Sequence, residues 1–359
     1  MPIKRTLLCA ALAALTATAA HADDIRWRIP LSFPSELPVL GDMAKYLAKT
    51  VESVSGGSIR FRLEEPGKIV PALGVLEAVK AGKLEAGYIW IGYDTGIVPA
   101  ASIIGGLPFG MEPWEYDAWL YEAGGREIVD GIYAPHNIKP IPCGTVGAET
   151  AGWFRKPFES VDDLKGLKIR FAGVGGSVVQ SLGASVTVLP GSELYQALDK
   201  GAIDATEFSM PSIDDRLGFY QIAKYNYFPG WHQLIAAHYL VVNLDTWNDL
   251  DDVQRAQIET SCMATNAKGI TFGEGQQGPT LAKFEKEGVN IGEIPEPLLL
   301  ELREASKKVI QEQIDSDPGY AKIYNSMAKF MSQYSRWKRL AYLPRDFDSI
   351  FDVLPAQDD

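Results

Sequence analysis

A single arginine, Arg170, stands at the end of a short apolar strand predicted by the run GLKIRFAG at residues 166–173, and a glycine-rich turn follows it. Strand ends beside glycine turns open onto ligand crevices in α/β proteins, and a guanidinium there can bind a carboxylate through two parallel hydrogen bonds. Arg170 therefore predicts a site for a small organic acid. The competing interpretation is a solvated or structurally paired arginine.

An acidic and an aromatic residue follow a second predicted strand, at residues 202–206. These are Glu207 and Phe208. At the edge of a crevice Glu207 would be a hard oxygen ligand for a cation, with the backbone carbonyl of Phe208 beside it. Alternatively, Glu207 caps a helix or is solvated, and Phe208 belongs to the core.

Four aromatic residues stand where the walls of such a crevice are expected. Phe33 follows the first predicted strand, Trp90 and Tyr93 follow the third, and Trp231 precedes an apolar run at 234–242. Their rings could clamp a ligand or could be ordinary buried packing.

The residues present disfavour an enzyme, and we expect no catalytic residue. There is no GxSxG motif, and the mature chain has only His136, His232 and His238. Scattered histidines are usually structural or on the surface, and His232 and His238 lack the i, i+4 spacing of a helical zinc site. Hydrolase and zinc chemistry are therefore both disfavoured.

The glycine turn at residues 173–176 superficially resembles a dinucleotide-binding loop. Position 178 is Val178 rather than the third glycine of that motif, and exported proteins seldom use nicotinamide cofactors. The feature that remains useful is the set of exposed amides at a helix start, which favours an anion close to Arg170.

The N-terminus has the pattern of an export signal. Lys4 and Arg5 precede an apolar run at 7–15, and Ala-His-Ala at 20–22 is a pattern that signal peptidase cuts. That run is shorter than the roughly 20 apolar residues of a membrane span. We therefore expect residues 1–22 to be removed and the mature chain to be periplasmic.

Charge argues against nucleic acid or an anionic membrane as partner. The sequence has 34 Lys and Arg against 46 Asp and Glu, and loss of Lys4 and Arg5 with the signal leaves 32 basic residues and a formal charge of −14. Such a surface repels polyanions. The two remaining cysteines, Cys143 and Cys262, either form one bridge in an oxidising compartment or stay unpaired.

Hydrophobic periodicity predicts two α/β lobes, because a mature chain of about 337 residues exceeds the usual size of one core. A β-α-β-α-β pattern at 25–91 predicts a doubly wound parallel sheet, and a second α/β pattern runs from 147 to 206. The C-terminal part is helical and ends in a long helix at about 296–340, which would brace the lobes or pair with a second subunit. The predicted divisions are 23–146 plus about 234–275 for lobe I, and 147–233 plus part of 276–340 for lobe II.

Four stretches together resemble one known family much more specifically than any single residue does. They are GWFRKPFESVDDLKGLKIRFAG (152–173), LPGSELYQALDKGAIDATEF (189–208), LGFYQIAKYNYFPGW (217–231) and LPFGMEPWEYDAWLY (107–121). The chain resembles the extracytoplasmic solute-binding proteins of tripartite ATP-independent periplasmic (TRAP) transporters, the DctP family. Within that family it is most similar to the branch that binds 2-oxo acids such as pyruvate, and to relatives that bind lactate.

The resemblance implies a type II periplasmic binding fold of two lobes joined by a hinge, and a set of site residues. Arg170 matches the arginine that holds the ligand carboxylate. A sodium or calcium ion would be held by Glu207, the carbonyl of Phe208 and position 233, which is Gln233 here. Trp90 matches a substrate-contacting tyrosine, and Tyr93 is close enough in the sequence to contribute.

The chain departs from that branch at three positions. Glu149 stands where an amide is usual and Gln233 where a glutamate is usual, so the negative charge has moved. Glu149 can accept but not donate a hydrogen bond unless it is protonated. The cation could then lie closer to Glu149, the ligand could carry a hydroxyl facing it, or no metal binds. Phe208 replaces a tryptophan, which predicts a wider pocket.

The function implied is capture of a small 2-oxo or 2-hydroxy monocarboxylate and its delivery to the integral membrane subunits of a TRAP permease. Two alternatives are a sensory binding protein with the same pocket and a secreted enzyme acting on small acids. A homodimer through the C-terminal helix is a further expectation.

Overall fold

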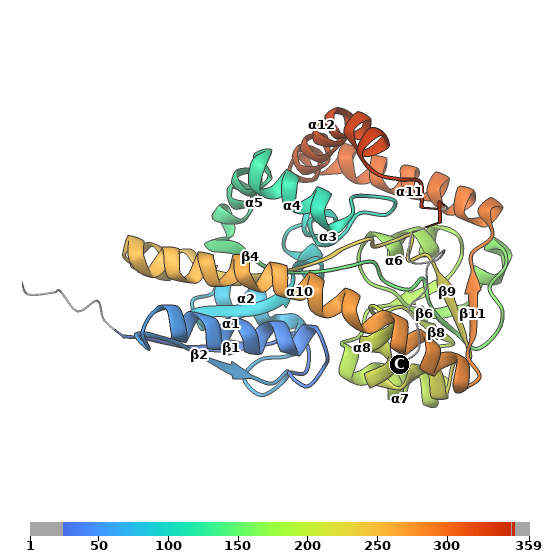
Figure 1. The fold of residues 1–359 in the computed structure, drawn as a ribbon, viewed down its shortest axis with the longest axis horizontal. Helices are drawn as coiled ribbons and strands as arrows, with labels where there is room; N and C mark the ends of the chain where they lie inside the picture. Colours follow the sequence, from blue (N-terminus) through green and yellow to red (C-terminus); the bar gives the residue numbers. More distant parts are fainter. Residues whose placement is uncertain (1–23, 346, 349–359) are drawn as a thin grey trace, which may run out of the picture.

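The computed structural model describes residues 24–345 and 347–348, and the predicted export signal at 1–22 lies outside this range. Figure 1 shows two α/β lobes side by side, with one long helix running along both of them. None of the helices formed within 24–345 combines the length and the apolar character that crossing a membrane requires.

The first lobe contains five strands, in a two-stranded and a three-stranded sheet that lie side by side. β1 (Ile25–Pro30) and β2 (Ile59–Glu64) are parallel, and a bridge between Leu31 and Tyr88 places β1 beside β3 (Ala86–Trp90). β10 (Ala236–Asn243) lies between β3 and β4 (Ile138–Val146) and is antiparallel to both. β10 is the run predicted to return to this lobe, and its direction is opposite to that of both neighbouring strands.

Helices cover this sheet through faces that the sequence spacing anticipates. In α1 (Leu40–Val54) the buried residues Met43, Leu47 and Val51 recur at helical intervals and pack on the sheet. The remaining helical segments of this lobe are η1 (Ala72–Gly74), α2 (Val75–Lys80), η2 (Ile91–Gly96), α3 (Ala101–Gly105), α4 (Pro113–Glu122), α5 (Gly125–Tyr133), η3 (Ala134–His136) and α9 (Leu244–Asn248).

The second lobe has a six-stranded sheet in the order β11-β9-β5-β8-β6-β7. These strands are β5 (Gly152–Phe154), β6 (Lys168–Arg170), β7 (Ser185–Thr187), β8 (Ala205–Thr206), β9 (Tyr225–Phe228) and β11 (Asn290–Glu293). β6 is parallel to β7 and β8, and β5 is antiparallel to β8 and β9. Its helical segments are η4 (Val161–Leu164), α6 (Gly173–Ser181), α7 (Gly191–Asp199), α8 (Pro211–Leu217) and η5 (Phe219–Gln221).

One helix, α10 (Asp252–Lys286), spans both lobes. It packs on β4 and α1 in the first lobe and on α8 in the second. A side chain at Gly269 would place its Cβ 2.4 Å from Met43 Sδ and 2.7 Å from the Thr145 carbonyl oxygen, so glycine is required for this close approach.

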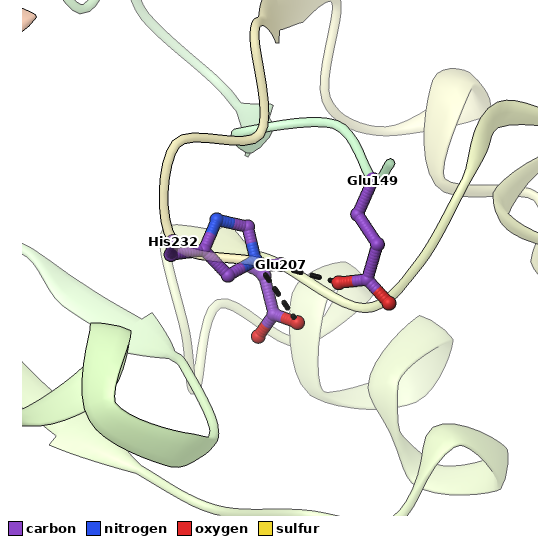
Figure 2. Close-up of side chains that lie close together, drawn as sticks. All are labelled: Glu149, Glu207 and His232. Carbon is purple, nitrogen blue, oxygen red and sulfur yellow. Dashed lines mark ion pairs between the residues drawn. The ribbon is translucent and has the colours of Figure 1, made fainter. Parts of the chain in front are cut away.

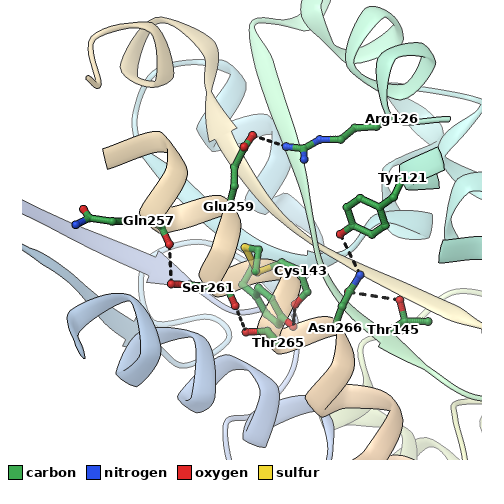
Figure 3. The surroundings of a disulfide bond; sticks show 11 residues. Tyr121, Arg126, Cys143, Thr145, Gln257, Glu259, Ser261, Thr265 and Asn266 are labelled. Atoms are coloured by element: carbon green, nitrogen blue, oxygen red, sulfur yellow. Dashed lines mark hydrogen bonds and ion pairs between the residues drawn. A yellow bond between two sulfur atoms is a disulfide. The ribbon is translucent and has the colours of Figure 1, made fainter. Parts of the chain in front are cut away.

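Cys143 and Cys262 form a disulfide that joins α10 to β4 (Figure 3), which settles the alternative left open by the sequence. The contact is extended by Asn266, whose side chain donates to the Tyr121 hydroxyl at 3.2 Å and accepts from Thr145 Oγ1 at 3.4 Å. α10 is thereby fixed to the first lobe.

The C-terminal segment differs from the single helix expected at about 296–340. It forms α11 (Glu296–Ser316) and a long C-terminal helix, α12 (Pro318–Ala341). The break lies at Asp317, whose φ of −131° and ψ of 115° are extended, because the residue before a proline is driven out of the helical region. α11 packs on α6 of the second lobe, and α12 packs on α3 and α5 of the first.

We predict that the double variant Cys143→Ser, Cys262→Ser unfolds more easily than the parent chain. The bond links residues 119 positions apart. A cross-link over so long a loop restricts the unfolded chain, and its removal should lower the free energy of unfolding by about 5 kcal/mol. Urea unfolding with and without a thiol reductant measures it. The reductant should lower the midpoint of the parent and leave the variant unchanged; equal midpoints for oxidised and fully reduced parent protein would contradict the prediction.

Candidate functional site

A narrow cavity of about 30 Å³ lies between the two lobes and collects most of the predicted site residues. A cavity of this size holds about two water molecules, so the lobes are close together here. From the first lobe its lining comprises Phe33, Leu40, Trp90, Tyr93, Ala236 and His238, and from the second lobe and the connecting segments Glu149, Arg170, Ala172, Glu207, Phe208, Ser209 and Gln233.

Arg170 reaches the cavity because it is the last residue of β6, between β7 and β8. The chain then turns through Gly173, whose φ of +64° favours glycine, into α6. The Arg170 side chain is 1% exposed. It is therefore a buried cation, and its partners decide what it can bind.

Four hydrogen bonds within the protein use most of the guanidinium donors. Nη1 donates to the Glu207 backbone carbonyl at 2.7 Å and to Glu207 Oε2 at 2.8 Å. Nε donates to the Leu189 carbonyl at 3.2 Å, and Nη2 donates to the Tyr93 hydroxyl at 3.2 Å. Among the described residues these are the partners of Arg170, which leaves one of its five N–H donors, on Nη2, for a ligand.

Glu207 is thus first of all the counter-ion of Arg170. Its Oε2 also accepts the Ala172 amide at 3.2 Å, at the start of α6. Its other oxygen, Oε1, faces His232 Nε2 at 3.7 Å. One carboxylate oxygen therefore fixes Arg170 while the other points to the centre of the site.

Glu149 and Gln233 form a second buried pair in the cavity lining. Gln233 Nε2 donates to Glu149 Oε1 at 3.0 Å. Their segments touch through the backbone as well, since a side chain at Gly230 would place its Cβ 2.2 Å from the Glu149 carbonyl oxygen. The close approach of these two connections brings Glu149 into the site.

His232 faces both carboxylates (Figure 2). Its Nε2 is 3.4 Å from Glu149 Oε2 and 3.7 Å from Glu207 Oε1. The ring is 1% exposed and packs edge-on against Phe171, with a centroid distance of 4.7 Å. His232 is therefore a buried, ion-paired histidine, which agrees with a structural residue rather than a surface one, and it is carried on a loop between β9 and β10.

Burial and neighbouring charges shift the acidities of this cluster. Burial raises the pKa of Glu149 to about 7, although His232 opposes the shift. Burial would also raise the pKa of Glu207, but Arg170 and His232 outweigh it and hold that pKa below its ordinary value. Burial lowers the pKa of His232, but the two carboxylates outweigh it and raise that pKa to about 9. In the absence of another cation, His232 therefore carries the positive charge between the carboxylates.

The aromatic walls are only partly as predicted. Phe33 and Phe208 line the cavity, and the Phe208 ring lies 5.3 Å from the Arg170 guanidinium. Trp90 lines the cavity with its ring while its Nε1 donates to the Gly105 carbonyl at 3.1 Å. Tyr93, rather than Trp90, therefore offers the polar group, since its hydroxyl accepts from Arg170 and keeps its own proton to donate.

One expectation is corrected. Trp231 is buried outside the cavity lining, where it packs against Phe109 and Phe171. The Phe208 ring lines the cavity and packs onto Gly191 at the start of α7.

Sequence reasoning also missed Ser209 and His238 in the lining. His238 Nδ1 lies 3.2 Å from the Ala236 carbonyl, and burial lowers its pKa to about 3, so the ring is neutral and presents Nε2 as an acceptor. His238 lies on β10, antiparallel to β3 opposite Trp90. The sequence does not show that β10 pairs with β3, and this pairing is what brings His238 to the cavity.

The residues present fit a bound cation. Glu207, Phe208 and Gln233, the ligands expected from the resemblance, all line the cavity. Glu149, Glu207 and His232 also each offer one possible ligand atom, and these atoms lie within 4.8 Å of one another. Gln233 Nε2 donates to Glu149, which leaves the side-chain carbonyl oxygen of Gln233 as a possible ligand.

Comparison with known proteins agrees with this geometry. The model of family 7 of bacterial extracellular solute-binding proteins, DctP, matches residues 32–317. A monocarboxylate 2-oxoacid-binding periplasmic protein from Nostoc is 34% identical over 321 residues, which cover 89% of this chain and 88% of that protein.

Two solved structures of TRAP solute-binding proteins are similar over 89% of this chain. One from Bordetella bronchiseptica, a dimer with calcium and picolinate in one active site, has a TM-score of 0.87, 30% identity and 95% coverage of its own chain. One from Pseudoalteromonas atlantica, with sodium and pyruvate, has a TM-score of 0.85, 32% identity and 97% coverage of its own chain. The resemblance and the two-lobe fold expected from the sequence are confirmed: this chain belongs to family 7 of the bacterial extracellular solute-binding proteins, the DctP family of TRAP transporters.

Proposed function

We propose that this protein captures a small 2-oxo or 2-hydroxy monocarboxylate in the periplasm, together with a cation, and delivers it unchanged to a TRAP permease. The observation that carries the proposal is the narrow cavity between the lobes, which is lined by the buried Arg170 and by the carboxylates of Glu149 and Glu207. The His232 imidazole lies 3.4 Å and 3.7 Å from these carboxylates. Two of the relatives described above bind a 2-oxo acid or pyruvate, and the third holds picolinate, another small monocarboxylate, which supports the same ligand class here.

The carboxylate of the ligand lies at the Arg170 side. The remaining Nη2–H of Arg170 and the hydroxyl of Tyr93 are adjacent donors, because these two groups are 3.2 Å apart. Together they present two donors to one carboxylate, one from each lobe. Glu207 holds Arg170 in place, so the guanidinium does not have to be ordered when the ligand arrives.

A cation at the other side would supply the positive charge that the ligand needs. Arg170 is already neutralised by Glu207, and His232 is neutralised by Glu149. A third buried carboxylate, that of the ligand, would be strongly disfavoured without compensation. Glu149, Glu207 and His232 would hold the ion, and the ion would attract the 2-oxo or 2-hydroxy oxygen of the acid.

The dimensions of the cavity favour a short acid. Phe208 is held between Gly191 and Arg170, and Trp90 contacts the second lobe at Gly173, where an added Cβ would lie 3.3 Å from its ring. A long aliphatic chain would have to displace one of these rings. The cavity therefore favours ligands in which the carboxylate and the second oxygen are on adjacent carbon atoms.

Binding is coupled to closure because the ligand contacts both lobes. Tyr93 and Phe33 belong to the first lobe, and Arg170 and Glu207 belong to the second. A ligand that bridges them binds the closed form better than an open one and shifts the population toward it. The closed form is what the permease would recognise.

The function is tested by a thermal-shift screen of the metal-stripped mature chain against 2-oxo, 2-hydroxy and longer monocarboxylates, each with and without added cations. Because a ligand of the native state raises the melting temperature by mass action, short 2-oxo or 2-hydroxy acids should raise it, and more so with a cation. Propionate, which has the same length but lacks the second oxygen, is the matched control. No shift with any acid and cation would contradict the proposal.

We predict that Arg170→Ala weakens acid binding at least about 100-fold, because it removes a carboxylate donor and leaves Glu207 buried without its counter-ion. Arg60→Ala is the control, since Arg60 is an exposed arginine paired with Glu52 on the surface. Isothermal titration calorimetry measures both.

Arg170→Lys tests the same role if the alanine variant does not fold. It keeps the buried charge but lacks the planar fork, so it should fold and still bind more weakly than the parent chain. Parent-like affinity in a folded Arg170 variant would exclude the assigned role.

We also propose a homodimer through the end of α12. Trp337, Leu340 and Leu343 are 60%, 73% and 71% exposed there, an unusual density of apolar side chains for a free surface. Light scattering should give a dimer for the mature chain and a monomer for Leu340→Asp. Val253→Asp, on an exposed apolar residue at the start of α10, is the control and should stay dimeric; a monomeric parent would overturn the proposal.

A further inference from the structure

We propose that His238 is a specificity-determining residue, through which the cavity selects 2-hydroxy monocarboxylates over the corresponding 2-oxo acids. The inference rests on the proposed function, in which a short monocarboxylate occupies the cavity between the lobes. It deepens that function because it separates the two ligand classes and assigns the choice to one neutral hydrogen-bond acceptor on the first lobe.

His238 reaches the cavity from β10. Ala236 and His238 are two positions apart, so their side chains lie on the same face of the strand, and both line the cavity. The register of β10 with β4 shifts directly after His238, because Tyr239 pairs with Pro142 and leaves Cys143 as an extra residue on β4. Such a bulge bends a strand locally and can redirect a side chain.

Two aromatic rings hold the imidazole in place. Phe33 lies edge-on to the His238 ring at a centroid distance of 5.4 Å, and Tyr88 stacks on it at 6.2 Å with an interplanar angle of 20°. The Tyr88 hydroxyl donates to the Cys143 carbonyl at 2.8 Å, so Tyr88 is itself held by the bulged position of β4. The ring is therefore oriented before a ligand arrives.

The hydrogen bond at Nδ1 determines which ring nitrogen is left for a ligand. Nδ1 lies 3.2 Å from the Ala236 carbonyl oxygen, which can only accept, so Nδ1 carries a proton. In a neutral imidazole the other nitrogen, Nε2, then has a lone pair and no proton. Nε2 of the buried His238 has no hydrogen-bond partner among the described residues. A buried acceptor needs a donor, and here the donor must come from the contents of the cavity.

The surroundings of His238 keep its ring uncharged. Phe33 and Tyr88 contact the ring, and Trp90 is its neighbour on β3. In the part of the chain that the structure describes, His238 forms no ion pair with a carboxylate, whereas His232 forms two. Burial without a counter-charge disfavours the protonated ring and lowers the pKa of His238 to about 3. The two buried histidines therefore differ: His232 is a cation, and His238 is a neutral acceptor.

The small size of the cavity makes this acceptor decisive. In a volume of about 30 Å³ a short acid is in contact with all of the lining side chains, that of His238 included. Arg170 and Tyr93 have hydrogen-bond donors, which suit the carboxylate of the acid. His238 Nε2 can only accept, which suits a hydroxyl group.

A 2-hydroxy acid and a 2-oxo acid differ at this acceptor. The hydroxyl of a 2-hydroxy acid can donate its proton to Nε2. The carbonyl oxygen of a 2-oxo acid has only lone pairs, so it would leave Nε2 buried without a donor. A site that is built to hydrogen-bond a hydroxyl discriminates strongly against an analogue without one, and we expect a preference of at least about tenfold.

The preference is measured by isothermal titration calorimetry of lactate and pyruvate, which differ only at carbon 2, into the mature chain in one buffer that contains both Na⁺ and Ca²⁺. The parent should bind the better enantiomer of lactate at least about tenfold more tightly than pyruvate. His238→Phe keeps a ring against Phe33 and Tyr88 but removes the acceptor, so the preference should fall below about threefold. His136→Phe, on a histidine outside the cavity lining, is the control and should match the parent.

Nuclear magnetic resonance of the chain labelled with ¹⁵N-histidine reports the tautomer independently of affinity. A two-bond ¹H–¹⁵N spectrum should show His238 as a neutral ring with its proton on Nδ1, and lactate should shift the Nε2 resonance more than pyruvate does. The signals are assigned by their loss in His238→Phe. If that variant fails to fold, His136→Phe assigns the other neutral ring, and the lactate preference of the parent together with its spectrum decides.

The inference and the proposed function fail in different ways. Equal affinity for the two acids, or a preference of the parent for pyruvate, would overturn the role of His238 and leave the proposed function standing. The same holds for a ring protonated at Nε2, or for a folded His238→Phe that keeps the preference of the parent. Failure of lactate, pyruvate and every other monocarboxylate of the thermal-shift screen to bind would overturn the proposed function and the inference together.

Discussion

Burial of the Arg170–Glu207 ion pair is the constraint on which the rest of the site depends. The two side chains are 1% and 3% exposed, so the cost of removing both charges from water must be recovered from close partners. Those partners are the Leu189 carbonyl before α7, the Ala172 amide at the start of α6 and the Tyr93 hydroxyl of the other lobe. Satisfying one pair therefore sets the mutual positions of two helix starts and of the two lobes.

The strand-end rule explains why part of the site could be predicted. Arg170 ends β6 and Glu207 follows β8, and the carboxyl ends of these neighbouring parallel strands meet at one edge of the sheet. The type and position of the two residues therefore indicate the site without any knowledge of long-range contacts. His232 carries no such signal, because it lies on a loop whose place depends on where β9 and β10 pair. The same holds for His238, which lies opposite Trp90 only through an antiparallel crossing. The break between the two C-terminal helices, by contrast, could have been predicted locally, because Pro318 disfavours a helical conformation at Asp317. The helical periodicity continues across this proline, and a prediction from periodicity alone therefore gives one helix.

The structure gives the two family departures a single physical account. Glu149 and Gln233 are in direct contact, with Gln233 Nε2 3.0 Å from Glu149 Oε1. An acid and an amide can form this hydrogen bond in either arrangement, so exchanging them preserves both the contact and the net charge of the pair. What the exchange changes is the location of the carboxylate, which is now 3.4 Å from His232 Nε2. A neutral amide at position 149 would leave the imidazole with one carboxylate neighbour instead of two.

The segments that carry this cluster are also the connections between the lobes. The chain leaves the first sheet at β4 and enters the second at β5 through the loop that holds Glu149, and it returns from β9 to β10 through the loop that holds His232 and Gln233. The two loops touch where Gly230 lies against the Glu149 backbone, a contact that leaves no room for a side chain. A rotation of the lobes would act on these two loops, and a ligand or ion that held Glu149 and His232 at their present separation would oppose it. The candidate site therefore lies on connections between the lobes rather than on one lobe alone.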